Sequence, residues 1–373
     1  MRVKAPIMEA QLVETALLNI INHQSLIATK AARVVWAAQG DPIMEFGLRR
    51  AQGPDAGTLG ARAAVIGGCC GTSNVLTGKL FDVPVKGTHA HSWVMSFSDE
   101  LTAFREYARL FPDACTLLVD TYNTLELGVP NAITVFREMK AAGIPLKNYG
   151  IRLDSGDLAY LSKQAKKMLE DAGFPDAVIS ASSDLDEYLI ASLKLQGAKI
   201  GLWGVGTKLI TSDDCPAFGG VYKLAAESDD KGGFIPKIKL SNNAGKVTNP
   251  GVKKVVRLYD KKTKKIKADI IMLEEEVIDE TKPLTLFDAS AKWKKMTLEA
   301  GTYFGRELLV PIFIDGACVY ESPKVMDIQA YCNEEKDSLW EEHKRLNNPH
   351  TVPVDLSEKL SILKSKLIDE MSK

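Results

Sequence analysis

Residues 150–184 read GIRLDSGDLAYLSKQAKKMLEDAGFPDAVISASSD. Two short apolar runs, Gly150–Leu153 and Val178–Ala181, flank an amphipathic stretch at Leu158–Ala172. This order predicts a strand, a helix and a second strand, a unit in which two parallel strands share a sheet beneath the helix. Both strands are followed by several small and polar residues, more than a turn after a purely structural core strand requires. The stretch therefore predicts a parallel sheet with polar groups at the carboxyl ends of its strands.

The same alternation of apolar runs and amphipathic stretches continues on both sides of this unit. Further strands are expected at Glu45–Leu48, Val83–Gly87, Ala114–Val119 and Lys199–Gly204. Further helices are expected at Glu9–Gln39, Ala56–Gly68, Glu100–Phe111, Asn131–Ala142 and Asp184–Gln196. Parallel strands covered by helices form either a barrel or a doubly wound sheet. The repeated polar strand ends favour the barrel, in which chemistry collects at the carboxyl ends of the strands.

The residue composition changes after Tyr222, where lysine-rich segments with Gly and Asn turns begin, a pattern typical of β-hairpins. We expect three parts: an α/β barrel domain at residues 1–225, a β-rich second domain at 226–330 and a C-terminal helical extension at 331–373. The last part carries an apolar stripe that includes Leu360 and Leu367, which is typical of a helix docked on other elements.

Composition excludes several classes of function. Lysine and arginine number 47 against 48 for aspartate and glutamate, so the net charge of −1 gives no field that would attract nucleic acid or a membrane. The lysines at 253–265 are better explained by a solvent-exposed hairpin than by a site for a polyanion, because an acidic run follows at 274–276. No apolar run is long enough for a membrane span, so the expected compartment is the cytoplasm.

The motif GTHAHS, residues 87–92, follows the expected strand at Val83–Gly87. His89 and His91 are two residues apart, so on a strand they would point to the same side. From the residues alone, an ordinary surface histidine and a metal-binding pair both remain open.

Three other expected strand ends carry polar residues. Arg152 and Asp154 share one face at the end of the strand at 150–153, where a guanidinium suits a planar carboxylate, although an ordinary salt bridge fits equally well. Ser183 and Asp184 follow the next strand and could equally be helix N-caps. Gly206 and Thr207 follow the strand at 199–204, where a glycine turn lets backbone N–H groups close on a phosphate.

These four motifs, in this order, resemble the nicotinate phosphoribosyltransferase family, a group of type II phosphoribosyltransferases. The resemblance extends to FGLRRAQGPDAG at 46–57, DTYNTLELGVPNAI at 120–133, GGVYKL at 219–224 and the stretch at 253–269. It implies an irregular α/β barrel with a second domain. It also implies an ATP-dependent, ligase-type enzyme of NAD salvage that joins nicotinate to phosphoribosyl pyrophosphate (PRPP), giving nicotinate mononucleotide and pyrophosphate.

The resemblance also assigns roles to individual residues. Thr88 and Arg152 would hold nicotinate, and Asp154 would organise Mg²⁺ or face the developing sugar cation, although the metal ligands stay unassigned. Ser183 and Asp184 would approach the ribose, Gly206 and Thr207 would bind a PRPP phosphate, and His91 would accept a phosphoryl group from ATP. Secondary candidates for phosphate binding and support of the site are Arg49, Arg50 and Asp120.

One departure concerns the N-terminus, because family members have more chain before the point where this sequence begins. That segment carries a tyrosine expected to stack on nicotinate and strands of the second domain. The family implies a homodimer with sites near the interface. The alternatives are a nicotinamide or quinolinate phosphoribosyltransferase, and an impaired fragment or pseudoenzyme that binds PRPP without turnover. Arg152 and the motif at 87–92 favour nicotinate.

Overall fold

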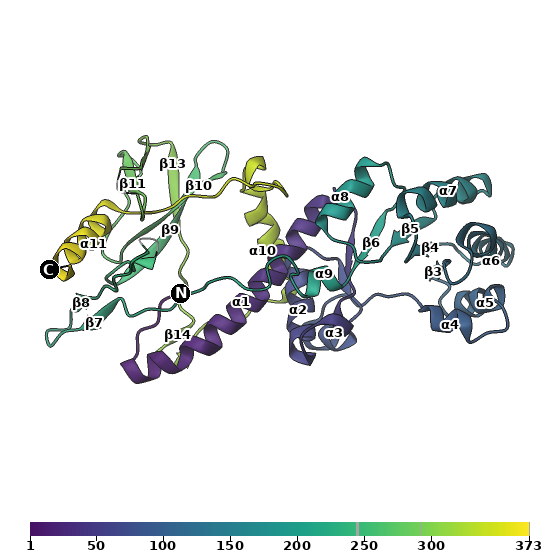
Figure 1. The fold of residues 1–373 in the computed structure, drawn as a ribbon, viewed down its shortest axis with the longest axis horizontal. Coiled ribbons are helices and arrows are strands. Elements are labelled where there is room, and N and C mark those ends of the chain that lie inside the picture. The colour runs from purple at the N-terminus through teal and green to yellow at the C-terminus, as the bar shows by residue number, and fades with distance from the viewer. Residues whose placement is uncertain (244–245, 292, 373) are drawn as a thin grey trace. The chain divides into compact units, whose positions relative to one another are not determined.

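The structure, a computed structural model, describes residues 1–243, 246–291 and 293–372. The chain forms two compact units, each described here by itself (Figure 1). The parallel unit comprises Ile20–Phe218 and Pro323–Asn333. The β-rich unit comprises Met1–Asn19, Gly219–Ser322 and Glu334–Lys373. Each unit therefore combines segments that are distant in the sequence.

The parallel unit is built on a curled sheet of six strands in the order β2-β1-β6-β5-β4-β3. All pairings between these strands are parallel. Their bounds are Ile43–Glu45 for β1, Gly71–Thr72 for β2, Ala114–Leu118 for β3, Asn148–Leu153 for β4, Val178–Ala181 for β5 and Leu202–Val205 for β6. Among the described residues β2 and β3 are not paired with each other, so the sheet is a half-barrel that stays open between these two strands.

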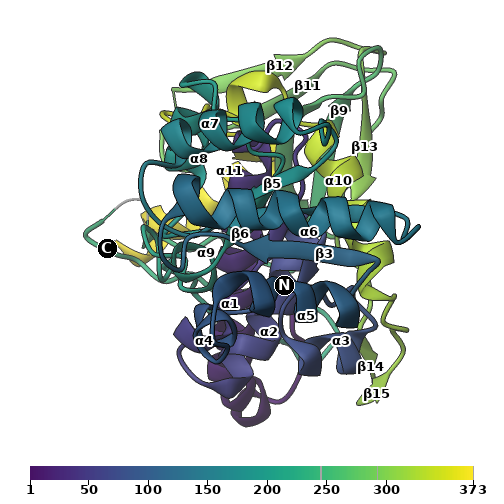
Figure 2. The ribbon, with the colours of Figure 1, turned by 90° about the vertical axis from the view of Figure 1, so that its right-hand side faces the viewer.

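Helices cover the convex side of this sheet. Figures 1 and 2 show α5, α6 and α7 along the outer side of β3, β4 and β5. The helix bounds in this unit are Pro54–Gly67 for α2, Val75–Phe81 for α3, His91–Met95 for α4, Glu100–Leu110 for α5, Val129–Ala141 for α6, Leu158–Asp171 for α7, Glu187–Leu195 for α8 and Thr207–Ile210 for α9. The long α1, Ile7–Ala37, runs from the β-rich unit into this one, and short turns lie at Leu48–Arg50 (η1) and Thr124–Gly128 (η2).

Aspartate N-caps explain where three helices of this unit begin. Asp99, Asp157 and Asp186 precede α5, α7 and α8, and each carboxylate accepts a hydrogen bond from a backbone N–H in the first turn. Such caps satisfy N–H groups that lack a partner within the helix. Between the helices and the strands lies an apolar core in which Leu117 and Ile151 are fully buried. The loops at the carboxyl ends of the strands therefore rest on a rigid base.

The β-rich unit centres on a mixed sheet in the order β12-β11-β16-β10-β9-β13. Its strands are β9 Lys253–Asp260, β10 Ile266–Leu273, β11 Leu284–Phe287, β12 Lys295–Leu298, β13 Tyr303–Glu307 and β16 Val354–Leu356. Two small hairpins pair β7 Ala226–Ser228 with β8 Phe234–Pro236 and β14 Phe313–Ile314 with β15 Ala317–Cys318. The remaining elements are α10 Val325–Asp337, which begins in the parallel unit, η4 Glu341–His343 and α11 Glu358–Met371.

The apolar face of α11 is docked, since Leu360 and Leu367 are buried and the helix contacts β10 and β11. Val256, Ile270, Leu286 and other apolar side chains of the sheet form the core of this unit. Within the described residues, no helix is long and apolar enough to cross a membrane.

The expected fold class, an α/β barrel type with a β-rich second part and a C-terminal helix, is confirmed. The expected strand at Val83–Gly87 is wrong, because only an isolated bridge joins Val85 to Thr72 there. Pro84 interrupts that run and lacks the N–H that a strand interior needs. The strand expected at Glu45–Leu48 ends at Glu45, since Leu48–Arg50 forms a 3-10 turn instead.

Candidate active site

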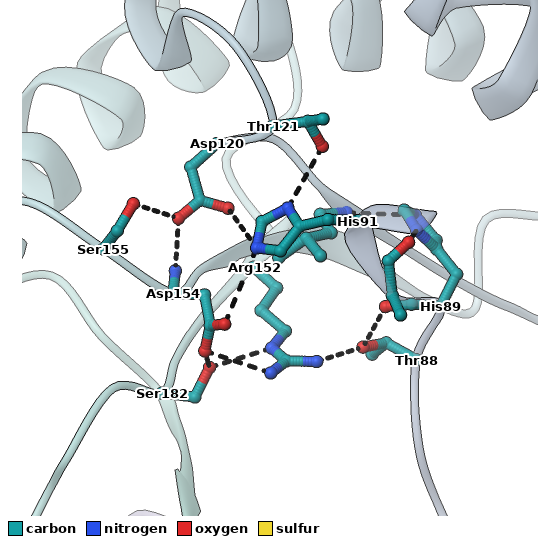
Figure 3. A network of polar contacts seen from close by, with 11 residues as sticks. Thr88, His89, His91, Asp120, Thr121, Arg152, Asp154, Ser155 and Ser182 are labelled. Atoms are coloured by element: carbon teal, nitrogen blue, oxygen red, sulfur yellow. Dashed lines mark hydrogen bonds and ion pairs between the residues drawn. The ribbon is translucent and has the colours of Figure 1, made fainter. Parts of the chain in front are cut away.

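Residues of the motifs at 87–92 and 152–154 lie together in the structure. Thr88, His91, Arg152 and Asp154 form one network with Ser182, the residue that directly follows β5 (Figure 3). The reason is topological, because β3, β4 and β5 are adjacent and parallel, so their carboxyl ends lie at the same edge of the sheet.

Arg152 is the centre of the network. Its Nε donates to Ser182 Oγ at 2.9 Å, one terminal nitrogen donates to Thr88 Oγ1 at 2.8 Å, and the other lies 3.1 Å from Asp154 Oδ1. The side chain is 18% exposed. Two of its three partners are hydroxyl groups, which can rotate to accept a different donor. Arg152 is therefore held in place without being fully neutralised by carboxylates.

Phe46 forms an apolar wall beside this guanidinium. The Arg152 guanidinium carbon lies 5.6 Å from the centre of the Phe46 ring. A Cβ added at Gly204 would stand 2.5 Å from the same ring, so only glycine lets the ring approach β6 this closely. A small pocket results, lined by Met44, Phe46, Thr88, Arg152, Ser180, Ala181, Leu202 and Gly204. Its lining combines apolar walls with a single cationic group, as expected for a flat ring that carries a carboxylate. Its volume of about 20 Å³ holds only about one water, so a ring would enter only if the lining side chains moved apart.

Asp154 is placed by a second carboxylate. Asp120 Oδ2 accepts hydrogen bonds from the Asp154 backbone N–H at 2.8 Å and from Ser155 Oγ at 2.6 Å. Asp154 Oδ1 also accepts a short hydrogen bond from Ser182 Oγ. The Asp120 side chain is 2% exposed, and its Oδ1 atom has no hydrogen-bond partner among the described residues. A buried carboxylate oxygen of this kind attracts a cation or a proton donor.

His91 faces both carboxylates. Its Nε2 lies 3.7 Å from Asp154 Oδ2 and 3.9 Å from Asp120 Oδ1, while its Nδ1 lies 3.2 Å from Thr121 Oγ1. The side chain is 39% exposed, so the ring can be reached from solvent. Its ring is thus oriented on both sides yet remains accessible.

His89 does not accompany His91, which corrects the expectation that both rings point to the same side. Ala90 is the N-cap of α4, so His91 begins a helix and the two residues do not share a strand. The His89 ring is buried instead, and its Nε2 accepts a hydrogen bond from the Leu118 backbone N–H at 3.1 Å. No described group of three or more His, Cys, Asp or Glu side chains is arranged to hold a metal ion.

Ser183 and Asp184 occupy a strained turn. Both have positive φ angles, 102° and 42°, which residues with a side chain rarely adopt. The turn lies directly between Ser182 in the network and the start of α8. Strain of this kind gathers at functional sites, where the surrounding structure maintains it.

Gly206 and Thr207 follow β6 as expected. Gly206 is the N-cap position of the short α9, and a Cβ there would lie 3.3 Å from the Phe46 carbonyl oxygen. Arg49 and Arg50 are exposed in the turn η1 that follows β1. Gly206 and Thr207 thus follow the end of β6, and Arg49 and Arg50 follow the end of β1.

The site also includes Phe46, Ser182 and Glu45, which the sequence alone did not predict. Glu45 is fully buried at the end of β1, where Gly47 N–H and Thr72 Oγ1 donate to its carboxylate. Burial raises the pKa of Glu45, and these two hydrogen bonds oppose the shift. A carboxylate within an apolar strand was the available signal for Glu45, whereas nothing in the local sequence marks Phe46 as a pocket wall.

Comparisons with known proteins agree over most of the chain. Residues 42–212 match the family described as "Nicotinate phosphoribosyltransferase (NAPRTase) family", and residues 252–364 match "Nicotinate phosphoribosyltransferase C-terminal domain". The nicotinate phosphoribosyltransferase of Bacillus subtilis is 51% identical over 358 residues, covering 96% of this chain and 72% of that protein. The nicotinate phosphoribosyltransferase of Homo sapiens is 30% identical over 421 residues, covering 98% and 76%.

Solved structures agree as well. The crystal structure of human nicotinic acid phosphoribosyltransferase matches with a TM-score of 0.81 and 28% identity, covering 97% of this chain and 78% of that one. The nicotinate-nucleotide pyrophosphorylase of Pyrococcus furiosus matches with a TM-score of 0.65 and 24% identity, which shows a shared fold alone.

Proposed function

This chain belongs to the nicotinate phosphoribosyltransferase family, and we propose that it joins nicotinate to PRPP and releases pyrophosphate, a step of NAD salvage. The observation that carries the substrate assignment is the pocket between Phe46 and Arg152. With the lining moved apart, an aromatic ring would pack against Phe46, and the guanidinium would donate to a carboxylate at the edge of that ring.

The preference for nicotinate over nicotinamide follows from the same contacts. Binding nicotinate replaces hydroxyl partners of Arg152 with a carboxylate, so that the guanidinium gains a charge-assisted pair. A neutral amide offers one acceptor and no charge. Quinolinate carries a second carboxylate, for which this small pocket has no second cation.

The chemical step is a displacement at the anomeric carbon of PRPP. The lone pair of the pyridine nitrogen forms the new C–N bond while the bond from that carbon to the pyrophosphate oxygen breaks, and pyrophosphate leaves with its electrons. Positive charge develops on the sugar, and the Asp154 carboxylate at the strand end is placed to stabilise it. Ser183 and Asp184 would contact the ribose, and the Gly206–Thr207 turn would bind a phosphate.

ATP coupling is assigned to His91. With the proton on Nδ1 directed to Thr121 Oγ1, the Nε2 lone pair is free to accept the terminal phosphoryl group of ATP, and ADP leaves. Later hydrolysis of the phosphohistidine would return the ring to its starting state. Two carboxylates lie near the same atom, with Asp154 Oδ2 at 3.7 Å and Asp120 Oδ1 at 3.9 Å from Nε2.

Mg²⁺ fits the same site as an ion that arrives with the pyrophosphate group. In the described part of the chain Asp120 Oδ1 is buried without a hydrogen-bond partner, and Asp154 Oδ2 lies at the same strand edge. Mg²⁺ usually keeps several waters and takes one or two carboxylates together with substrate phosphates. Asp120 and Asp154 would hold it, and bound there it would neutralise charge on the leaving pyrophosphate.

The family also supports a cytoplasmic homodimer as the working assembly. Light scattering of the purified protein tests the dimer directly, since a mass of one chain in solution at assay concentration would contradict it.

The defining experiment incubates the purified chain with PRPP, Mg²⁺ and nicotinate, and measures nicotinate mononucleotide by chromatography. Nicotinamide and quinolinate are tested in parallel, each with and without ATP. The proposal expects product from nicotinate, with faster formation when ATP is present. PRPP binding without product from a folded sample would contradict it and favour a pseudoenzyme, and a preference for nicotinamide would contradict the substrate assignment.

A further inference from the structure

The segment at residues 84–90 crosses the open side of the half-barrel. At one end it joins the β2 edge, where Thr72 N–H donates to the Pro84 carbonyl and Lys86 N–H donates to the Thr72 carbonyl, both at 3.0 Å. Beyond Lys86 the segment has no regular secondary structure until α4 begins at His91. It therefore leaves β2 and reaches the network without forming a seventh strand.

The other end of this segment meets the β3 edge through one side chain. Leu118 is the last residue of β3, and its backbone N–H donates to His89 Nε2 at 3.1 Å. The next N–H along, that of Val119, donates to the Arg152 carbonyl on β4 at 3.2 Å. Successive N–H groups point to opposite sides of a strand, so the Leu118 N–H faces the free edge, where a further strand would otherwise supply its acceptor.

His89 is also the anchor of its segment. Among residues 84–92, all of them described, it is the one buried residue, with 7% exposure. Its ring packs edge-on against Tyr107 at 4.7 Å and lies 6.0 Å from the Phe104 ring, both on α5. These contacts fix the ring between α5 and the β3 edge. Its neighbours in the chain carry groups of the active site.

The hydrogen bond requires a neutral ring with Nε2 unprotonated, because the group facing Nε2 is itself a donor. The proton then sits on Nδ1, 3.4 Å from the Ala90 carbonyl. Burial lowers the pKa of His89 to about 4, and the nearby charges of Arg152 and His91 act in the same direction. The environment therefore keeps the acceptor form that the geometry needs.

We propose that His89 is a positioning residue that closes the open edge of the half-barrel with its imidazole in place of a strand, and thereby fixes Thr88 and His91. Thr88 accepts from Arg152, and His91 faces Asp120 and Asp154, so a shift of the segment disturbs both groups. The kinetic consequences rest on the proposed function, whereas the hydrogen bond itself does not.

Two substitutions separate the acceptor from the bulk of the ring. His89→Leu keeps apolar volume and removes the acceptor, and His89→Gln places an amide oxygen near the position of Nε2. His23→Leu is the matched control, since His23 is a partly buried histidine of the same unit outside the network. All variants are made in the full chain.

The first readout is hydrogen exchange of the Leu118 amide, followed by mass spectrometry of short peptides. We expect at least tenfold faster exchange at Leu118 in His89→Leu, near wild-type exchange in His89→Gln, and no change in the control. Unchanged protection in a folded His89→Leu variant would overturn the proposal. If that variant does not fold, loss of protection in a folded His89→Gln variant would overturn it instead.

The second readout is steady-state kinetics. For His89→Leu we expect KM for nicotinate to rise and the ATP-stimulated kcat to fall, each at least fivefold, with most of both recovered in His89→Gln. Equal losses in the two variants would overturn the positioning role. Wild-type protein without transferase activity would instead contradict the proposed function and leave the exchange result standing, so the two failures are distinguishable.

Discussion

Arg152 of the parallel unit and Arg257 of the β-rich unit both pair with carboxylates, but in different ways. Arg257 forms a bidentate pair with Asp269, at 2.8 and 2.9 Å, and a further contact with Glu335 at 3.0 Å. The hydrogen bonds with Asp269 raise the pKa of Arg257. Arg152 has a single contact with a carboxylate, at 3.1 Å, and two with hydroxyl groups.

The difference indicates that Arg257 stabilises the fold, whereas Arg152 is available to bind a ligand. Arg257 joins β9 to β10 and to the end of α10, and its charge is satisfied within its unit. Arg152 is oriented by groups that can turn away, and it borders a pocket with an aromatic wall. A ligand carboxylate would give Arg152 the kind of partner that Arg257 already has.

The largest expected effect is on catalysis by Arg152→Gln. Losing the charge-assisted pair with nicotinate should lower kcat/KM for nicotinate by about 100- to 1000-fold, which corresponds to roughly 3–4 kcal/mol. The melting temperature should change little, because the lost contacts within the protein are mostly to hydroxyls. Steady-state kinetics and calorimetry on one preparation check both statements, and a fall below tenfold would break the comparison.

Arg257→Gln should show the reverse pattern. Removing the guanidinium leaves Asp269 partly buried without this bidentate partner, while Glu335 keeps its ion pair with Arg306. The loss should lower the free energy of unfolding by roughly 2 kcal/mol. The kcat/KM for nicotinate should stay within about twofold of wild type, because the residue lies in the β-rich core network and not among the strand-end motifs. Urea unfolding monitored by fluorescence measures the loss. Unchanged stability would remove the structural role assigned to Arg257.

A third prediction concerns the neutral imidazole of His89. The pKa of His89 is about 4 in the folded chain against 6.5 ordinarily, so between these values the unfolded chain binds the extra proton. The contribution of His89 is therefore complete above pH 6.5 and is lost as the pH falls toward 4. Between pH 7 and pH 5, wild type should lose about 2 kcal/mol more stability than His89→Gln. Urea titrations at both pH values test this, and parallel losses would contradict it.

The smallest expected effect comes from Gly204→Ala. The new methyl group would meet the Phe46 ring at 2.5 Å and push it into the pocket, so KM for nicotinate should rise about five- to tenfold, or about 1 kcal/mol. Gly201→Ala is the control, because its Cβ would lie 3.9 Å from the nearest atom, an ordinary contact. Equal KM values in the two variants would remove Phe46 from the nicotinate site.

Much of this site could be predicted from local sequence, because parallel topology brings strand ends together. Arg152 and Asp154 lie two residues apart on one strand end, so the shared face follows from the period of a strand, and the structure shows their side chains in contact. The strand at Val178–Ala181 was expected with its observed bounds. The start of α7 was also expected, since Asp157 is a typical N-cap.

Other features depend on contacts that no local pattern encodes. The side chains of His89 and His91 point in different directions because Ala90 is the N-cap of α4, which begins at His91. This helix has only five residues, too few for a helical period to be recognised in the sequence. Phe46 becomes a pocket wall only because Gly204, on a different strand, leaves room for its ring. Residues 1–19 belong to the β-rich unit although they precede the parallel unit in the sequence. Amphipathic spacing predicts the helix but does not show which unit it packs against.

The most direct test of the central claim is the ratio of kcat/KM for nicotinate to kcat/KM for nicotinamide, measured in wild type and in Arg152→Gln. If Arg152 recognises the carboxylate, wild type should favour nicotinate strongly, and the variant should lose at least tenfold of that ratio, mainly through nicotinate. A variant that is slower with both substrates but keeps the wild-type ratio would show that Arg152 does not select the acid, and would contradict the account.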